Sequence, residues 1–352
     1  MEDLHVDVVI VGACVSGVNA AHRIQTQFPH LSYTILEARG SIGCTRYLFK
    51  YPGIRPDSDL YTFGFTWRVW SSEEAIVEGR AIKKYLIESA EKFENVRSLD
   101  VEMLGAEQKT VRSGFVLYGS GYYDYDEPLK AVIPGLENFK GTTIHSQFWP
   151  EHLDYSNKKI IIIGSGATAV ALLPVLAQKA ESVTMLQRRP TYIISVPAKD
   201  KASWIRNLLP SFIVHRLVRW KFMWMVFLYF QFCREFPALT TKQIKEATER
   251  KLFYRALRKN NANVITDTIE RVTDTVILTA CGTHLDADII ITNTGLKMKI
   301  AGGAQISIDG QPTRISDRFI WKGMMVQDIP NSAFLLGYSN ASGTLGARSL
   351  EI

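Results

Sequence analysis

The sequence predicts an α/β fold with two parallel sheets, because one strand–turn–helix–strand pattern occurs twice along the chain. Residues 6–11 are rich in β-branched side chains and lead into a glycine turn at 12–17, a helical pattern and the strand-like LSYTILEAR at 31–39. The pattern returns with KKIIIIGSGATAVALLPVLAQ at 158–178 and SVTMLQRRP at 182–190. Two such βαβ units are typical of two dinucleotide-binding, Rossmann-like domains.

The expected domain order follows from these units. Residues 1–150 are the first part of one domain, and residues 151–260 form the second domain. Residues 202–250 are helical in pattern and rich in Trp, Phe and Arg, which predicts a helical insertion in the second domain. Strand-like segments between 262 and 295 close a sheet, so we expect residues 261–352 to return to the first domain in a truncated form.

The first glycine turn has Gly12 and Gly17 but carries Cys14 where the GxGxxG fingerprint has its middle glycine. The first glycine of this fingerprint makes the tight turn, the second lets the pyrophosphate approach the backbone, and the third lets helix and strand pack closely. Glu37 follows the next strand, where an acidic side chain binds ribose hydroxyls. These features predict a dinucleotide site with Cys14 inside it.

The second turn is a complete GxGxxA with Gly164 and Gly166, and it includes Thr168. Arg188 and Arg189 end the following strand, where an arginine accommodates the 2′-phosphate of NADP. The sequence therefore favours NADPH over NADH, and the alternative interpretation is that these are ordinary surface arginines.

Composition excludes several classes of protein. A net charge of +6 without a block of like charges does not suggest a nucleic-acid partner. Four scattered cysteines and a start without a secretory signal predict a reducing, cytoplasmic location. The apolar stretch 222–230 is far shorter than the roughly 20 residues of a membrane span. We expect it to pack in the core or cover the active site, and the alternative is a helix lying on a membrane surface.

A family resemblance comes from FKGTTIHSQFWP at 139–150, which matches FxGxxxHxxxWP through Phe139, Gly141, His145, Trp149 and Pro150. Five further segments extend the match: SIGCTRYLFKYPGIRPDSDLYTFGF, SGYYDYDE, TMLQRRPTYIIS, KGMMVQDIPN and GYSNAS. The chain resembles class B flavoprotein monooxygenases over nearly its whole length. It is most similar to the Baeyer–Villiger monooxygenases of the branch that contains the ethionamide-activating enzyme.

The resemblance implies an FAD- and NADPH-dependent monooxygenase. In such enzymes NADPH reduces FAD, O2 adds at the flavin C4a position, and the peroxyflavin attacks a carbonyl, sulfide or amine. The aromatic helix expected at 220–232 suggests either an apolar small-molecule substrate or an apolar lid over the site. The resemblance gives Asp57 the place of an active-site aspartate, although from the residues alone Asp57 is a turn residue or helix cap. It assigns FAD to Gly12, Cys14, Gly17, Glu37 and Thr45, and NADPH to Gly164, Gly166, Thr168 and Arg188.

The chain also departs from the family pattern. Cys44 and Arg46 replace a glycine and a tryptophan expected near the flavin. The stretch 93–115 is shortened, a segment that carries the family's active-site arginine is missing between Lys251 and Leu252, and Gly343 replaces a tryptophan close to an early C-terminus. These departures motivate an alternative function, a catalytically impaired paralogue that retains nucleotide binding. A disulfide reductase is disfavoured because it needs a second cysteine close to Cys44, and the next one is Cys233.

Overall fold

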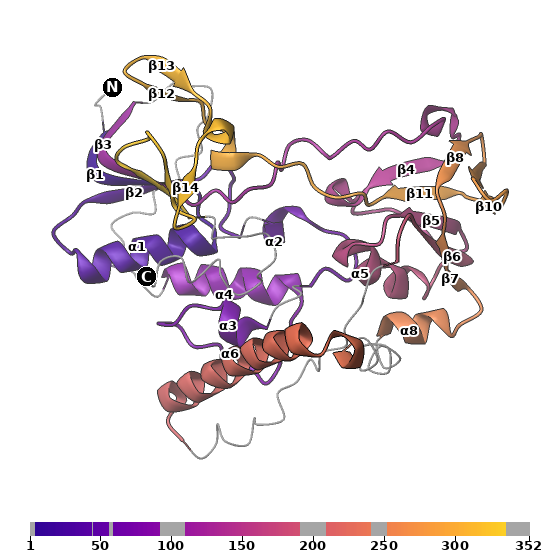
Figure 1. Cartoon of the computed structure of the whole chain (residues 1–352), viewed down its shortest axis with the longest axis horizontal. Coiled ribbons are helices and arrows are strands. Elements are labelled where there is room, and N and C mark those ends of the chain that lie inside the picture. Colours follow the sequence, from indigo (N-terminus) through magenta and orange to yellow (C-terminus); the bar gives the residue numbers. More distant parts are fainter. Residues whose placement is uncertain are drawn as a thin grey trace.

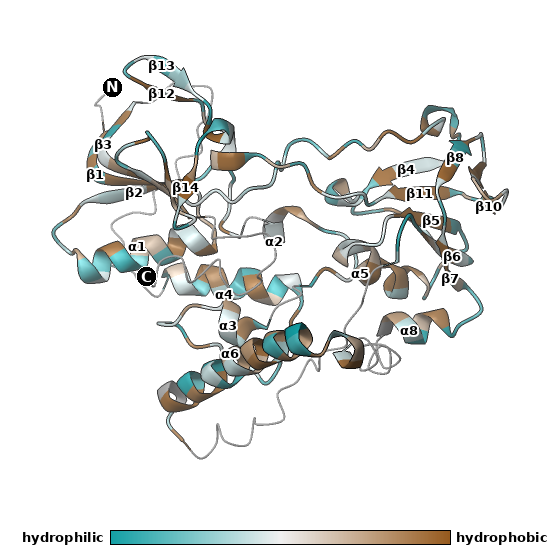
Figure 2. Cartoon of the chain, in the orientation of Figure 1, coloured by the Kyte–Doolittle hydropathy of each residue, from teal (hydrophilic) through white to brown (hydrophobic). Residues whose placement is uncertain are grey.

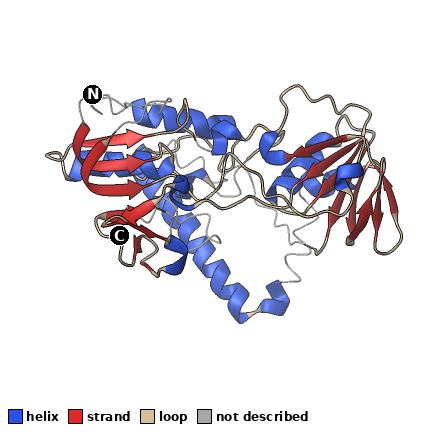
Figure 3. Ribbon diagram, turned by 90° about the horizontal axis from the view of Figure 1, so that it is seen from above, coloured by secondary structure: helices blue, strands red, loops and turns tan. Residues whose placement is uncertain are grey.

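The computed structural model describes residues 4–43, 45–55, 59–91, 110–190, 209–240 and 252–335. Two parallel sheets lie toward opposite ends of the long axis, with helices against them (Figure 1). The view from above shows the same separation, with extended connections running between the two sheets (Figure 3). The α/β class and the two Rossmann-like units are thereby confirmed.

The first sheet has the strand order β16-β3-β1-β2, and all its pairs are parallel. Strand β1 is buried from Val8 to Ile10, as expected for an apolar run covered on both faces. Helix α1 packs on it through an apolar face that includes Ala20, Ala21 and Ile24. The elements of this region are β1 (Leu4–Val11), α1 (Val15–Gln27), β2 (Tyr33–Leu36), α2 (Thr45–Leu48), α3 (Leu60–Phe63), α4 (Gly79–Glu91), β3 (Val111–Tyr118) and β16 (Ser332–Phe334).

The second sheet has five parallel strands in the order β4-β11-β5-β6-β7. Strand β5 is its centre, and four isoleucines, 160–163, are almost fully buried there. The chain runs from β5 to β6 on one side, whereas β11 lies on the other side, so the strand order reverses between β5 and β11. The elements are β4 (Thr142–His145), β5 (Lys159–Ile163), α5 (Ala167–Leu176), β6 (Ser182–Gln187), α8 (Leu252–Leu257), β7 (Ala262–Thr266) and β11 (Ile289–Thr292).

The strand composition of the second sheet differs from the expected domain ranges. Strand β4 precedes residue 151, and β7 and β11 follow residue 260, yet all three belong to this sheet. The expected boundaries placed these strands in the first domain because sequence patterns show where strands lie but not which strands exchange hydrogen bonds. The chain rejoins the first sheet at β16, which pairs with β3.

The remaining elements are peripheral, apart from one long helix. An antiparallel sheet of β8 (Ile269–Val272), β9 (Val276–Thr279) and β10 (His284–Asp286) stands beside the second sheet. Helix α6 (Ser211–Glu235) falls in the expected helical insertion and packs against α3. The others are hairpins β12 (Ile306–Ile308) with β13 (Gln311–Thr313) and β14 (Ile320–Trp321) with β15 (Met325–Val326), and short 3-10 turns at Leu136–Asn138, Ser146–Phe148, Ile300–Gly303 and Ile315–Asp317.

Candidate cofactor site between the two sheets

The first glycine turn follows β1 and has no room for side chains at its two glycines. Gly12 has φ +102°, and a Cβ there would lie 2.8 Å from the Cα of Ser120. A Cβ on Gly17 would lie 1.9 Å from the carbonyl oxygen of Gly12. The turn is therefore closed by direct contact between the strand end and the first turn of α1, the arrangement that the fingerprint requires.

Cys14 is the N-cap of α1, with φ −88° and ψ −171°. Gly166 is the N-cap of α5 and has nearly the same backbone, with φ −72° and ψ 179°. Any residue can adopt this extended conformation, so Cys14 does not strain the turn. A Cβ on Gly166 would meet nothing within 4 Å. At this position a side chain would affect the bound pyrophosphate and not the folding of the loop.

Glu37 lies directly over the first turn. Its carboxylate accepts hydrogen bonds from the backbone N–H of Ala13 at 2.7 Å and of Arg39 at 3.1 Å. These bonds place the acidic group beside the turn, where the ribose of a bound dinucleotide is expected. Glu37 and the first turn are therefore in direct contact, which is the arrangement that the sequence predicts.

The second glycine turn follows β5, at the point where the strand order of the second sheet reverses. Gly164 has φ +124°, and a Cβ there would lie 2.2 Å from the carbonyl oxygen of Asn293, which comes directly after β11. Ligands of open α/β sheets bind in the crevice at such a switch point. The structure therefore adds Asn293, which the sequence analysis missed, to the residues around this turn.

Two polar groups of this region lack protein partners. The Nδ2 of Asn293 and the Oγ1 of Thr294 are buried and make no hydrogen bond to the described part of the chain. Asn293 is held in place because its Oδ1 accepts a hydrogen bond from the Ser146 hydroxyl at 2.9 Å. Buried polar groups normally have partners, so these two atoms beside the second turn are candidates to bind a ligand.

The other residues assigned to NADPH border the same turn. Thr168 lies in the first turn of α5, and its hydroxyl is 3.5 Å from the hydroxyl of Tyr51. Arg188 follows β6 and is exposed, which leaves it accessible to a ribose phosphate. Gly166 and Ala167, directly before Thr168 in the chain, are also exposed. The N-terminus of α5 is thus open to a ligand.

The fingerprint FxGxxxHxxxWP secures the edge strand β4. Phe139 packs into the apolar cluster on one face of the second sheet, and Trp149 packs into the cluster on the other face. A Cβ on Gly141 would lie 2.5 Å from the carbonyl oxygen of Asp288, so glycine is needed there. His145 ends β4, and burial lowers its pKa. Pro150 is exposed at the end of the motif.

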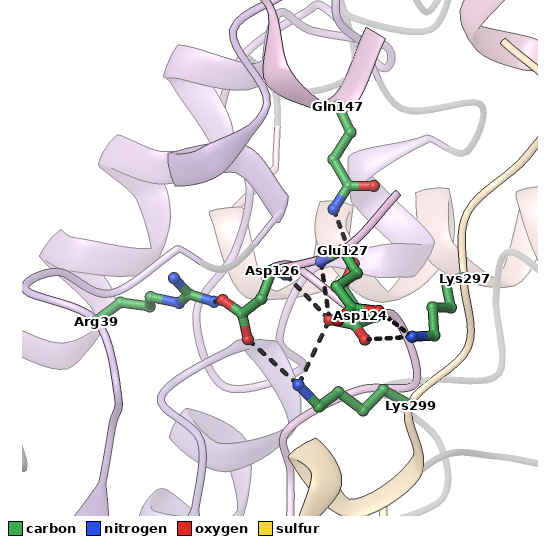
Figure 4. Close-up of polar contacts among 7 residues, drawn as sticks. All are labelled: Arg39, Asp124, Asp126, Glu127, Gln147, Lys297 and Lys299. Carbon is green, nitrogen blue, oxygen red and sulfur yellow. Dashed lines mark hydrogen bonds and ion pairs between the residues drawn. The ribbon is translucent and has the colours of Figure 1, made fainter. Parts of the chain in front are cut away.

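A cluster of charges ties together the two chain segments that cross between the sheets (Figure 4). Asp124 is 3% exposed, and its carboxylate lies 3.4 Å from the Lys299 ammonium and 3.6 Å from that of Lys297. The backbone N–H groups of Asp126 and Glu127 donate to the same carboxylate and, with Lys299, hold its pKa below the usual value.

Further contacts extend this cluster to the first sheet and to the fingerprint. Arg39, two residues after Glu37, pairs with Asp126 at 2.6 Å. The side-chain amide of Gln147 donates to the Asp124 carbonyl at 2.8 Å (Figure 4). The cluster therefore connects the loop after Glu37 with the part of the fingerprint that follows β4.

Several expected residues fall outside the described residues, namely Asp57, Cys44, Lys251 and Gly343, as does the stretch 92–109. Thr45 begins α2, and its hydroxyl is 3.0 Å from the hydroxyl of Tyr125. Cys14, Cys233 and Cys281 form no disulfide. Within the described ranges, no group of three or more His, Cys, Asp or Glu side chains could hold a metal ion. Among the described helices, none combines the length and apolar character that a membrane crossing requires.

Comparison with known proteins places the chain among flavoproteins. Residues 100–300 match the profile of the flavin-binding monooxygenase-like family. The chain is 39% identical over 393 residues to the FAD-containing monooxygenase EthA of Mycolicibacterium smegmatis, covering 97% of this chain and 80% of that protein. It is 36% identical over 390 residues to the probable FAD-binding monooxygenase AlmA of Acinetobacter baylyi, covering 97% and 78%. Both alignments are longer than the 352-residue chain, so these relatives carry internal residues that this chain lacks.

Solved structures show the same fold. A steroid monooxygenase bound to NADP superposes with a TM-score of 0.74 at 19% identity, covering 99% of this chain and 84% of that one. The complex of OTEMO with FAD and NADP gives 0.73 at 19% identity, covering 98% and 84%.

Proposed function

Because the chain belongs to the flavin-binding monooxygenase family, we propose that it binds FAD at the first glycine turn and NADPH at the second and oxygenates a small apolar molecule. The reaction proposed is Baeyer–Villiger oxygenation of a ketone, or oxygenation of a sulfur or nitrogen atom. The observation that carries this proposal is the pair of dinucleotide turns, each at the carboxyl ends of a parallel sheet and joined by the charged cluster around Asp124.

The residues of the first site would bind FAD through the backbone. The closed turn at Gly12 and Gly17 puts the N-terminus of α1 next to the pyrophosphate, where backbone N–H groups and the helix dipole favour an anion. Glu37 would accept from the ribose hydroxyls while keeping its bond to Ala13. Cys14 adds a side chain to this surface and so weakens the approach of the phosphates.

The residues of the second site would hold the nicotinamide dinucleotide against the flavin. Gly166 leaves the N-terminus of α5 open to the pyrophosphate, Asn293 offers its free amide N–H at the switch point, and Arg188 would pair with the 2′-phosphate. When bound, the two cofactors supply hydride transfer and oxygen activation. The protein's part is to orient them and to exclude water from the space between the sheets.

The substrate class is proposed from the relatives. One solved neighbour is a cyclohexanone monooxygenase with cyclohexanone bound, and another is a steroid monooxygenase. A cyclic ketone is therefore the first substrate to test, followed by an alkyl sulfide. Asp57, given an active-site place by the family resemblance, is the residue proposed to set the charge near the flavin.

The test begins with the purified chain. Flavin absorbance in the protein, or its appearance after reconstitution with FAD, and oxygen-dependent oxidation of NADPH are the expected results. A colourless protein that FAD cannot reconstitute would refute the proposal. Tight NADPH binding without oxygen uptake on any ketone or sulfide would instead support the impaired paralogue, which Cys14 and the residues lacking relative to EthA motivate.

Coenzyme choice has its own test. Arg188→Glu should weaken binding of NADPH by at least tenfold and leave NADH binding nearly unchanged, because only NADPH carries the 2′-phosphate. Arg112, on the first sheet, is the matched control for loss of a positive charge. Equal loss for both coenzymes, or loss with the Arg112→Glu control, would contradict the role of Arg188.

A further inference from the structure

Helix α6 is firmly attached to the protein at its N-terminal half. Val214, Val218 and Phe222 pack with Tyr61 and Ala75 in one apolar cluster. In addition, the Arg219 guanidinium donates to the carbonyl oxygens of Tyr61 and Gly64, at 3.5 and 3.1 Å. The direction in which the rest of the helix leaves the body is therefore fixed by buried contacts.

The following part of α6 has no such cover. Seven consecutive large apolar residues, 224–230, are each 40–64% exposed. Seven residues make about two helical turns, so apolar side chains surround the helix on all sides there. Figure 2 shows apolar residues over much of α6, and in Figure 3 the long helix extends away from both sheets. The expectation that residues 222–230 pack in the core holds for Phe222 alone in this structure.

The charges and aromatic residues of α6 suit one kind of partner. Arg216 and Lys221 are exposed cations, and the single acidic residue of the helix, Glu235, pairs with the exposed Arg234 at 3.1 Å. Trp220, Trp224 and Tyr229 are exposed among them. Tryptophan and tyrosine favour the boundary between lipid headgroups and acyl chains, and cations beside it attract anionic headgroups.

We propose that α6 binds the surface of an anionic lipid bilayer and inserts residues 224–230 into one leaflet. A helix that lies along the membrane surface buries its apolar side chains about 5–10 Å into the boundary between headgroups and acyl chains, a zone that the large exposed side chains of residues 224–230 can fill. The helix is too short in apolar length to cross, in agreement with the absence of a spanning helix among the described residues.

A second copy of the chain explains the surface less well. A partner helix would cover one side of residues 224–230 and leave the apolar side chains of the other side exposed to water. Pairing two copies would also place Arg216 and Lys221 of both copies at one interface, where the single acidic residue of each helix, Glu235, already pairs with Arg234. Anionic lipid offers acyl chains to the exposed apolar side chains and negative headgroups to the nearby cations.

Flotation of the full-length chain with lipid vesicles tests this proposal. Vesicles of equal parts phosphatidylcholine and phosphatidylserine should carry the protein, whereas phosphatidylcholine alone should bind it at least tenfold less, and added salt should weaken binding. A blue shift of tryptophan fluorescence should accompany binding because Trp224 leaves water. Phe227→Glu should reduce binding at least tenfold. The matched control is Phe319→Glu, directly before β14, where the side chain is 85% exposed. This variant should bind vesicles as the wild type does.

Three results would overturn the proposal: no flotation with either vesicle, equal flotation of the Phe227→Glu variant, or a concentration-dependent dimer that Phe227→Glu abolishes. Thermal unfolding of each variant shows that a loss of binding is not a loss of fold. The vesicle assay needs neither FAD nor NADPH, so its failure is independent of the proposed oxygenation.

Discussion

The closed first turn makes Gly17→Ala a sharp test of the fold around the FAD site. The added methyl group would lie 1.9 Å from the Gly12 carbonyl oxygen, and both atoms are fixed by backbone. Overpacking of this kind costs about 3 kcal/mol. The higher helix propensity of alanine offsets roughly 1 kcal/mol of this cost. The free energy of unfolding of the first domain should therefore fall by about 2 kcal/mol.

Gly166→Ala is the matched control, because it also adds a methyl group to a dinucleotide turn. That methyl group meets nothing within 4 Å, and its backbone is accessible to alanine. It should cost less than about 1 kcal/mol, the scale of an N-cap change. Urea denaturation followed by far-UV circular dichroism compares both variants with the wild type. If Gly17→Ala unfolds at the wild-type midpoint, or if Gly166→Ala is equally destabilised, the contact between Gly12 and Gly17 does not have the role argued for it.

Three further predictions concern single residues. Cys14→Gly should raise FAD affinity, measured by flavin fluorescence titration, without moving the unfolding midpoint; equal affinity would mean that the turn accommodates the thiol. Asn293→Ala should lower NADP affinity about fivefold in calorimetry, the effect of one hydrogen bond, and leave FAD affinity unchanged, whereas an equal loss of both would point to general misfolding. Burial, with a smaller contribution from Arg23, lowers the pKa of His22 to about 4. The unfolded state is protonated below pH 6.5 while the folded state resists protonation, so stability should fall as the pH drops from 6.5 toward 4. His22→Gln should flatten that decline in urea midpoints, and an unchanged slope would exclude His22 as its source.

The features predicted from sequence are those set by local chemistry. The two glycine turns, Glu37 and the strands before them follow from periodicity and from the space that glycine leaves. The pairing of Ser146 with Asn293 could not be predicted, because 147 residues separate them and only the parallel register of β4 and β11 brings them together. Composition likewise identified the apolar stretch of α6 but not that its second half projects from the body.

The strand partners of the second sheet illustrate the same limit. The segments that became β4, β7 and β11 were recognised as strand-like or as a motif, yet their hydrogen bonds join parts of the chain on both sides of the βαβ unit. Long-range pairing depends on how the apolar faces of the whole domain come together. The fingerprint around Trp149 therefore indicates the family from sequence, whereas its role in packing β4 is visible only in the folded sheet.

The cluster around Asp124 has a mechanical consequence. The buried Asp124 carboxylate binds both crossing segments. The segment that contains Asp124 and the one that contains Lys297 and Lys299 should therefore move together as one rigid unit. Ser120 of the first segment lies against Gly12, and Asn293, just before the second, lies against Gly164, so the cluster fixes how the two glycine turns are spaced.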